Sequence, residues 1–293
     1  MWLLVLNRSS GKGNLEKKLN EFKSLCKRNA VIYEIIDESS AFRTSSKMQD
    51  FIANQKIEAL VAFGGDGLVS LCIQHITQTS IGFTVVPTGT GNDFARSIGT
   101  YRKSVPHIFN SIRDANKNHV DVAVAQSDAF KRYFVQVLSI GFDATVNELA
   151  NQMSFPKGKS KYTIAMLRRL PKARNTDFEI VQSEKKIQVS SMLIAVANGA
   201  TYGGGMRILP DASFHDGKLN LLYVDPVSKI TLLSIFPRVF RGTHIKHPAV
   251  HIIEDDEFQI FGPAKAYADG ELIGSLPIRL SVLKGGLTVW ECK

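Results

Sequence analysis

The sequence has few of the features that secreted or membrane-spanning chains need. It contains three cysteines, Cys26, Cys72 and Cys292, without paired spacing, so we expect a reducing cytosol rather than a disulfide framework. The opening apolar run, Met1–Leu6, is too short to cross a bilayer and lacks the basic start and cleavage site of a signal peptide. We therefore expect a cytoplasmic globular protein whose first residues form a buried strand.

Composition narrows the class of protein further. Hydrophobic residues make up 44% and charged residues 22% of the chain, which is ordinary for a globular enzyme and excludes a disordered one. A length of 293 residues suggests two domains. The net charge of +9 favours anionic partners such as phosphates or acidic lipids. No recognition motif supports nucleic acid, so we expect none as a partner.

Two familiar nucleotide-binding motifs are absent from the N-terminal half. The turn after the first strand, residues 7–13, is not a Walker A loop, because Leu6 stands where glycine is needed and Gly13 where serine or threonine is needed. It does not fit the GxGxxG pattern either. Its polar side chains and glycine amides are still able to hold phosphates, although a plain turn and helix cap explains the same residues equally well.

Three apolar runs nevertheless end in polar, glycine-bearing turns. They are Trp2–Leu6, Ala59–Phe63 and Thr84–Pro87. In an open parallel α/β sheet such strand ends share one edge, where ligands bind. A helical pattern follows the second turn, and a helix start there directs N–H groups at a phosphate. Asp66 lies inside that turn, and a carboxylate beside phosphates requires a cation between them. The pattern predicts a nucleotide site with Mg²⁺.

The chain changes character near residue 120, where we place the boundary between a nucleotide-binding α/β domain, 1–120, and a β-rich domain, 121–293. A helix is predicted over Val105–Lys117, and helical segments over Tyr162–Leu170 and Ser228–Phe240. Alternating apolar and polar residues predict mostly antiparallel strands in the second half. The predicted strands are Val120–Ala125, Tyr133–Ile140, Phe178–Gln182, Lys186–Ala197, Leu219–Val224, Val250–Glu254, Phe258–Phe261, Ile278–Leu283 and Leu287–Trp290. The predicted fold is an α/β domain with a parallel sheet followed by a β-sandwich-like domain, with the active site in the cleft between them.

Six short motifs along nearly the whole chain carry a resemblance to a known family. They are Asn7–Gly11, Gly64-Gly-Asp-Gly67, the Pro87–Phe94 turn, Gly203-Gly-Gly205, Asp216-Gly-Lys-Leu219 and Asp269-Gly-Glu271. In this order the chain resembles the diacylglycerol kinase catalytic-domain family, which also contains sphingosine and ceramide kinases and soluble bacterial lipid kinases. The Gly-Gly-Asp-Gly turn is shared with NAD kinases and phosphofructokinases, so the two later motifs make the lipid kinase interpretation the specific one.

The resemblance implies Mg²⁺-dependent transfer of the γ-phosphoryl group of ATP to a lipid hydroxyl, with diacylglycerol as the favoured acceptor. Asp66 and Asp93 would organise the metal and its waters, and Asp269 and Glu271 would lie near the acceptor, with Glu271 as base. A structural Mg²⁺ would be held by Asp216 and by carbonyls at Ser213 and Lys218. Together the turns and the resemblance give these ATP-binding candidates: Asn7, Ser9, Ser10, Gly11, Gly64, Gly65, Asp66, Gly67, Leu68, Val69, Ser70, Thr88, Gly89, Thr90, Asn92 and Asp93.

Three residues depart from the family pattern and keep a non-catalytic relative open, while the shared Gly-Gly-Asp-Gly turn keeps an NAD kinase open. Leu68 stands where the family usually has threonine, Leu71 where it has glutamate, and Arg8 where proline is common. The first two changes remove a hydroxyl and a carboxylate from the phosphate end of the site. The alternatives are an NAD kinase and a non-catalytic lipid- or nucleotide-binding relative.

A run of basic residues surrounds the helical segment Tyr162–Leu170. Its members are Lys157, Lys159, Lys161, Arg168, Arg169, Lys172 and Arg174. A solvated charged face and a surface for anionic phospholipid explain the run equally well. A kinase acting on a lipid at the membrane surface would use the second, with peripheral association at the inner face of the membrane. The sequence leaves the oligomeric state open, a homodimer included.

Overall fold

The computed structural model describes residues 1–10, 14–114, 117–153, 155, 159–183 and 185–292. The chain forms two compact units, which we call unit 1 (Met1–Val120 with Gly285–Lys293) and unit 2 (Asp121–Lys284). The domain ranges expected from the sequence placed residues 285–293 in the second domain, whereas the structure groups them with unit 1. Among the described residues, no helix has the length and apolar content needed to cross a bilayer.

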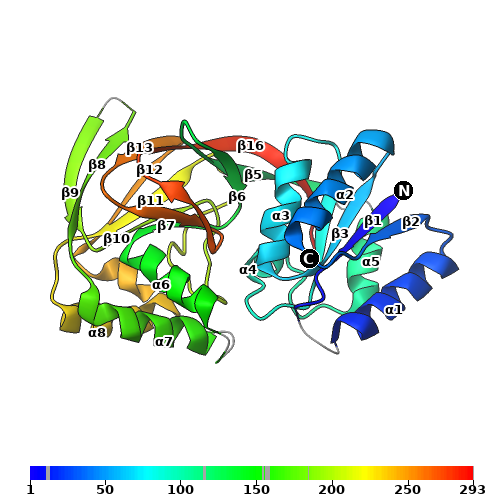
Figure 1. Ribbon diagram of the computed structural model, residues 1–293, viewed down its shortest axis with the longest axis horizontal. Helices are drawn as coiled ribbons and strands as arrows, with labels where there is room; N and C mark the ends of the chain where they lie inside the picture. Colours follow the sequence, from blue (N-terminus) through cyan, green and yellow to red (C-terminus); the bar gives the residue numbers. More distant parts are fainter. Residues whose placement is uncertain (11–13, 115–116, 154, 156–158, 184, 293) are drawn as a thin grey trace. The chain divides into compact units, whose positions relative to one another are not determined.

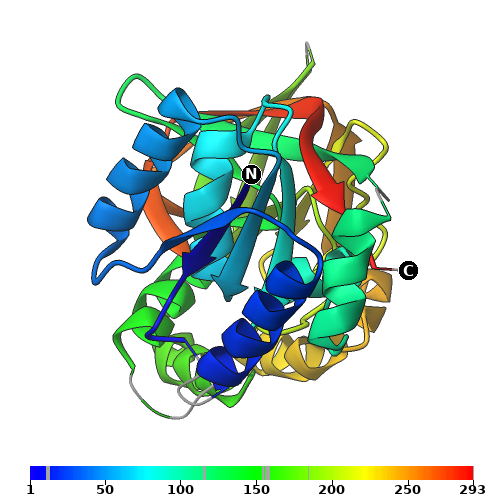
Figure 2. The same cartoon turned by 90° about the vertical axis from the view of Figure 1, so that its right-hand side faces the viewer.

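Unit 1 is a parallel sheet covered by helices on both faces (Figures 1 and 2). Its strands are β1 (Trp2–Leu6), β2 (Tyr33–Ile36), β3 (Ala59–Gly64) and β4 (Gly82–Pro87), paired in the order β2-β1-β3-β4. The helices are α1 (Asn14–Arg28), α2 (Ala41–Asn54), α3 (Asp66–Ile76), the short α4 (Asp93–Ser97) and α5 (Val105–Arg113). This arrangement confirms the α/β fold expected for the N-terminal half.

The strand and helix periods explain why the two faces of this sheet are both buried. Side chains of a strand alternate between faces, and Trp2, Leu4 and Leu6 of β1 join one cluster with α1 and α5. The buried positions of α1 recur at three- and four-residue spacing, from Leu15 through Leu19 and Phe22 to Cys26. Strands that bury both faces read as continuous apolar runs, which is why they were recognisable in the sequence.

Unit 1 is closed by the end of β16 (Ile278–Trp290), whose last residues pair with β4 in parallel. The Trp290 side chain is fully buried and lies against Gly82, where an added Cβ would be 2.1 Å from the indole ring. Gly82 is therefore required by close packing rather than by backbone conformation. The two strands predicted over Ile278–Leu283 and Leu287–Trp290 are one strand, because extended backbone continues through Gly285 and Gly286.

Unit 2 contains a six-stranded sheet in the order β12-β11-β10-β7-β14-β15. Its strands are β7 (Val137–Gly141), β10 (Leu193–Ala197), β11 (Leu219–Val224), β12 (Val250–Asp255), β14 (Lys265–Ala268) and β15 (Glu271–Ser275). The other strands of the unit are β5 (Lys117–Gln126), β6 (Lys131–Phe134), β8 (Thr176–Gln182), β9 (Lys185–Ser191) and β13 (Glu257–Phe261), and the first residues of β16 pair with β13. Alternating side chains bury one face of the six-stranded sheet against these other strands, confirming the sandwich-like fold.

Helices cover the opposite face of the six-stranded sheet (Figure 1). They are α6 (Phe142–Gln152), α7 (Lys159–Arg169) and α8 (Lys229–Val239), together with the 3₁₀ turns η1 (Leu170–Lys172) and η2 (Thr243–Lys246). Helix α6 and the strands β14 and β15 were not predicted. The helix expected over Val105–Lys117 ends at Arg113, since Lys117 already begins β5.

Two predicted strands are each divided in the structure. The run Lys186–Ala197 becomes β9 and β10, and the run Tyr133–Ile140 becomes β6 and β7. In the second case the backbone N–H groups of Val135, Gln136 and Val137 donate to the carboxylate of Asp269. An acceptor far along the chain therefore takes the donors at this break, which local periodicity does not reveal.

Candidate functional site

The turns after β1, β3 and β4 are joined by hydrogen bonds at one edge of the unit 1 sheet. The N–H of Asn7 donates to the carbonyl of Phe63 at 3.0 Å, and the N–H of Thr88 donates to the carbonyl of Gly64 at 2.9 Å. The hydroxyls of Ser10 and Thr88 lie 2.9 Å apart. Parallel strands present their carboxyl ends on the same side, so the structure brings the predicted turns together.

Glycines at this edge allow two main chains to approach closely. A Cβ added to Gly89 would lie 2.7 Å from the Cα of Gly65 and 3.1 Å from Oδ1 of Asn92. The amide of Asn92 donates to the carbonyl of Gly89 at 2.6 Å, and Asn92 has a positive φ of 56°. The sequence interpretation assigned these glycines to ligand approach, whereas packing between the turns already requires them.

Two carboxylates converge beneath Gly91. Oδ1 of Asp66, the first residue of α3, accepts the N–H of Phe94 at 3.1 Å. Oδ1 of Asp93 lies 3.9 Å from Nε of Arg96, and the Asp93 residue is only 3% exposed. A Cβ on Gly91 would lie 2.5 Å from Oδ2 of Asp66 and 3.6 Å from Oδ2 of Asp93. Gly91, which was not among the candidates chosen from the sequence, therefore lets the Asp66 carboxylate lie close to the main chain.

The remaining candidates of unit 1 differ in exposure. Leu68, Val69 and Ser70 are buried, and the Leu68 side chain packs against Gly64, where an added Cβ would be 2.7 Å away. Gly67 and Thr90 are exposed. Asn7 accepts the N–H and hydroxyl of Ser9 through Oδ1 at 3.0 and 2.6 Å, while Gly11 lies outside the described residues. The side chains of Leu68, Val69 and Ser70, at the start of α3, are therefore not placed to contact a ligand.

A lysine that the sequence did not single out lies at the same edge. The ammonium of Lys18, on α1, donates to the carbonyl of Pro87 at 2.6 Å. Partial burial lowers the pKa of Lys18. A lysine in a basic amphipathic helix carries no distinguishing sequence signal, so tertiary structure alone reveals it.

In unit 2, the motif Asp269-Gly-Glu271 forms the hairpin between β14 and β15. Positive φ angles of 48° at Asp269 and 85° at Gly270 are typical of a two-residue type I′ turn. The Asp269 carboxylate accepts N–H groups of Val135 at 2.9 Å, Gln136 at 2.9 Å and Val137 at 3.2 Å. The Asn151 amide on α6 donates to the Gly270 carbonyl at 2.7 Å. These bonds fix the position at which β15 begins.

Glu271 is the first residue of β15. Its side chain is exposed, yet neighbouring protein atoms displace enough water to raise the pKa of the Glu271 carboxyl, and the charge of Arg132 partly opposes this effect. A raised pKa makes a carboxylate a better proton acceptor. Asp269, with three donors on its carboxylate, is better suited to position the turn.

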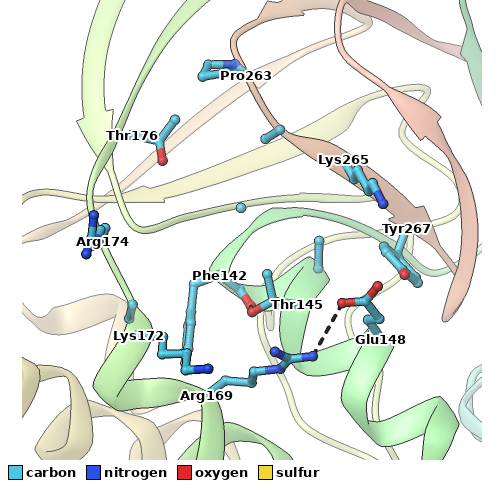
Figure 3. Close-up of a pocket in the computed structure, with 14 residues that line it drawn as sticks. Phe142, Thr145, Glu148, Arg169, Lys172, Arg174, Thr176, Pro263, Lys265 and Tyr267 are labelled. Atoms are coloured by element: carbon cyan, nitrogen blue, oxygen red, sulfur yellow. Dashed lines mark hydrogen bonds and ion pairs between the residues drawn. The ribbon is translucent and has the colours of Figure 1, made fainter.

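A cavity of about 410 Å³ lies beside this hairpin, within unit 2 (Figure 3). It is lined by Gly141, Phe142, Ala144, Thr145, Glu148, Arg169, Lys172, Ala173, Arg174, Thr176, Pro263, Ala264, Lys265 and Tyr267. Arg169 and Glu148 form an ion pair at 3.4 Å, drawn as the dashed line in Figure 3. Burial raises the pKa of Tyr267, and the charges of Glu148 and Glu271 add to the shift. The Tyr267 end of the cavity is therefore electrostatically close to Glu271.

Comparison with known proteins supports the sequence resemblance. Residues 1–125 match the family described as diacylglycerol kinase catalytic domain, and residues 136–291 match the YegS C-terminal NAD kinase beta sandwich-like domain. A diacylglycerol kinase of Mycobacterium tuberculosis is 33% identical over 235 residues, covering 79% of this chain and 76% of that protein. The chain belongs to the diacylglycerol kinase family. Membership favours a lipid kinase over an NAD kinase.

More distant relatives agree with this assignment. A diacylglycerol kinase of Staphylococcus carnosus is 26% identical over 302 residues, covering 99% of this chain and 94% of that protein. The structure of a putative diacylglycerol kinase from Bacillus anthracis aligns with a TM-score of 0.81 at 20% identity, covering 99% of this chain and 96% of that one. The structural likeness shows that this family member shares the fold.

The loop around Asp216, where a structural metal was expected, is held by hydrogen bonds between protein groups. The Asp216 carboxylate accepts the N–H of Lys218 at 3.0 Å, and the Ser213 hydroxyl accepts the N–H of His215 at 3.2 Å. Asp121 accepts the N–H of Gly217 at 2.7 Å. Within the described part of the chain, histidine, cysteine and acidic side chains form no group of three suited to a metal. A metal role for Asp216, Ser213 and Lys218 stays a prediction.

The basic run around α7 is only partly described. Lys157 and the side chain of Lys159 lie outside the described residues. Arg168 is exposed on α7 beside Leu167, which is 46% exposed, whereas Arg169 faces the cavity. The run therefore divides between an outer surface and the wall of the cavity.

The bonds of Asp269 generate a stability prediction. We expect Asp269→Asn to destabilise the protein by about 1.5–3 kcal/mol, because an amide presents one acceptor oxygen to three donors and adds an N–H₂ group. Denaturant unfolding measures this change, and Asp211→Asn, at an exposed position of the same unit, is the control. Equal stability of wild type and Asp269→Asn would contradict a positioning role.

Proposed function

We propose that this chain transfers the γ-phosphoryl group of ATP to the hydroxyl of a lipid, in a Mg²⁺-dependent reaction. Diacylglycerol is the favoured acceptor, because the curated relatives carry that substrate in their names. The observation that carries the proposal is the convergence of the Asp66 and Asp93 carboxylates beneath Gly91, at the ends of parallel strands. Phosphoryl transfer depends mainly on positioning and charge neutralisation, which this edge of the sheet is suited to supply.

Unit 1 is the proposed ATP-binding part. The main chain at Gly64–Ser70 and the start of α3 would hold the phosphates, since the positive end of the helix dipole favours anions there. Thr90, with an exposed side chain, and the turn that contains Asn7 and Ser10 would contact the nucleotide from either side.

The same edge fits a magnesium ion. Mg²⁺ prefers carboxylate oxygens and retains several waters, so two carboxylates beside the same glycine suit it, directly or through water. Bound there, Mg²⁺ would neutralise charge on the transferring phosphoryl group. Asp66 and Asp93 would hold the ion, and Nε of Arg96 lies 3.9 Å from Oδ1 of Asp93.

Unit 2 is the proposed lipid-binding part. As the lipid oxygen forms its bond to phosphorus and ADP leaves, the hydroxyl proton passes to the Glu271 carboxylate. Asp269 holds the hairpin on which Glu271 stands. The cavity beside Tyr267 takes the polar end of the lipid and the first part of a chain, while the rest of the acyl chains remains outside it.

Replacement of Asp66 tests the ATP-binding proposal. Asp66→Asn preserves size and removes the charge, so kcat should fall about 100-fold or more as phosphate and metal lose their position. A radiolabelled γ-phosphate transfer assay with diacylglycerol measures the change, and an unfolding curve confirms an intact fold. Near wild-type kcat at saturating Mg²⁺ would refute the assignment. ATP binding by the wild type without transfer to any lipid would select the non-catalytic alternative.

The pH dependence tests Glu271 as base. The basic form of Glu271 is lost as pH falls through its pKa, and because that pKa is raised, the acid limb of kcat/KM should lie above the range of an ordinary glutamate. Glu271→Gln should lower kcat by about 10²–10⁴-fold with little change in ATP affinity and should abolish the limb. An unchanged acid limb in Glu271→Gln would exclude this role.

Peripheral association of a cytoplasmic protein with anionic phospholipid at the inner face of the membrane completes the proposal. All three cysteines are free and buried, as suits a reducing compartment. Lys161→Gln with Arg168→Gln should weaken vesicle binding about tenfold, and salt should weaken binding of the wild type. Sedimentation with acidic vesicles measures both, with Lys185→Gln plus Lys186→Gln as a charge-matched control on β9. Salt-independent binding would contradict an electrostatic contact.

A further inference from the structure

The lining of the unit 2 cavity contains four basic residues and one acidic residue, an excess of positive charge that a neutral lipid would not use. Glu148 is the only acid among the lining residues, and Arg169 already pairs with it at 3.4 Å. Within the described part of the chain, Lys172, Arg174 and Lys265 form no ion pair. Figure 3 shows Lys172 and Lys265 on opposite sides of the cavity, with Arg174 at a third position. A group bound between them would meet cations from several directions.

The start of α6 adds to this positive character. Gly141, Phe142, Ala144 and Thr145 line the cavity, so the positive end of the helix dipole lies there. The acid of this first turn, Asp143, is not among the residues that line the cavity. Asp143 is buried and accepts the hydroxyls of Tyr162 and Tyr202, and burial raises its pKa toward the neutral form.

The cavity also has apolar walls. The rings of Phe142, Pro263 and Tyr267 and the methyl groups of Ala173 and Ala264 contribute to the lining. A pocket with apolar walls and a few convergent polar groups binds an oriented amphiphile. A volume of about 410 Å³ suits a headgroup and the first part of a chain.

We infer that, among lipids with a free hydroxyl, the cavity favours one that also carries a phosphate or carboxylate group over neutral diacylglycerol. The acidic group lies between Lys172 and Lys265, and the hydroxyl lies toward Tyr267 and the Glu271 carboxylate. Charge-assisted hydrogen bonds are stronger than neutral ones, so the cations select for an acidic lipid. This inference rests on the proposed function and narrows its acceptor.

The test compares two acceptors in the full-length enzyme with ATP and Mg²⁺. Short-chain phosphatidylglycerol, which has hydroxyls and one phosphate, and diacylglycerol of the same chain length are presented in neutral detergent micelles. The wild type should show a higher kcat/KM for the acidic lipid. Lys172→Gln with Lys265→Gln should lower the ratio of the two kcat/KM values about tenfold or more. Lys185→Gln with Lys186→Gln removes the same charge elsewhere in the unit and should leave the ratio unchanged.

A second measurement separates this inference from the proposed function. Calorimetric binding of monomeric short-chain phosphatidylglycerol should be weakened in the Lys172 and Lys265 double variant and unchanged in the control. Such a result supports the acidic-lipid site even if no lipid is phosphorylated, which would refute the proposed kinase activity alone. Transfer to diacylglycerol at an equal or higher kcat/KM, with no effect of the double variant on the ratio, would overturn the inference. Stimulation of diacylglycerol turnover by a phosphatidic acid that has no free hydroxyl, lost in the double variant, would overturn it as well, because the site would then bind an effector.

Discussion

The close approach of two turns at the sheet edge of unit 1 is the constraint on which the candidate ATP site depends. The carbonyl of Gly64 accepts the N–H of Thr88, and the main chains at Gly65 and Gly89 come too near for side chains. A methyl group at Gly89 would separate the turns and move the Asp93 helix start away from Asp66. Parallel pairing of β3 with β4 aligns the turns, but the glycines set the distance between the two carboxylates.

In unit 2, a carboxylate rather than a pair of glycines holds two segments together. Asp269 takes three N–H donors at the break between β6 and β7, and so ties a hairpin to the centre of the six-stranded sheet. Both residues of the turn have positive φ, and aspartate followed by glycine adopts that conformation more readily than most pairs. The motif thus fixes the residue at which β15 begins, and with it the position of Glu271.

Much of the fold of unit 1 was predictable because β1, β3 and β4 are buried on both faces and are followed by polar, glycine-bearing turns. In unit 2 the sandwich-like class was predictable from alternation, but β14, β15 and α6 were not. The four residues of β14 are too few to show a period. Helix α6 buries polar residues such as Asp143 and Asn147, whose hydrogen-bond partners lie on other segments of the chain. The acidic residues of the motifs were found in the sequence, whereas Gly91, Lys18 and the cavity cations depend on contacts between distant segments.

The departure from the family pattern at Leu68 bears on the candidate site through packing. The Leu68 side chain is buried and packs against Gly64, so its apolar contacts stabilise the edge of the sheet. Threonine at this position would lack the apolar contact that Leu68 makes with Gly64. Phosphate contacts made by main-chain N–H groups would be the same with either residue. Relative to the family pattern, Leu68 and Leu71 remove a hydroxyl and a carboxylate, while Asp66, Asp93, the glycine turns and the helix start are present. Phosphoryl transfer requires positioning and neutralised charge, and Asp66 and Asp93 are the acids of this edge that bear on both requirements.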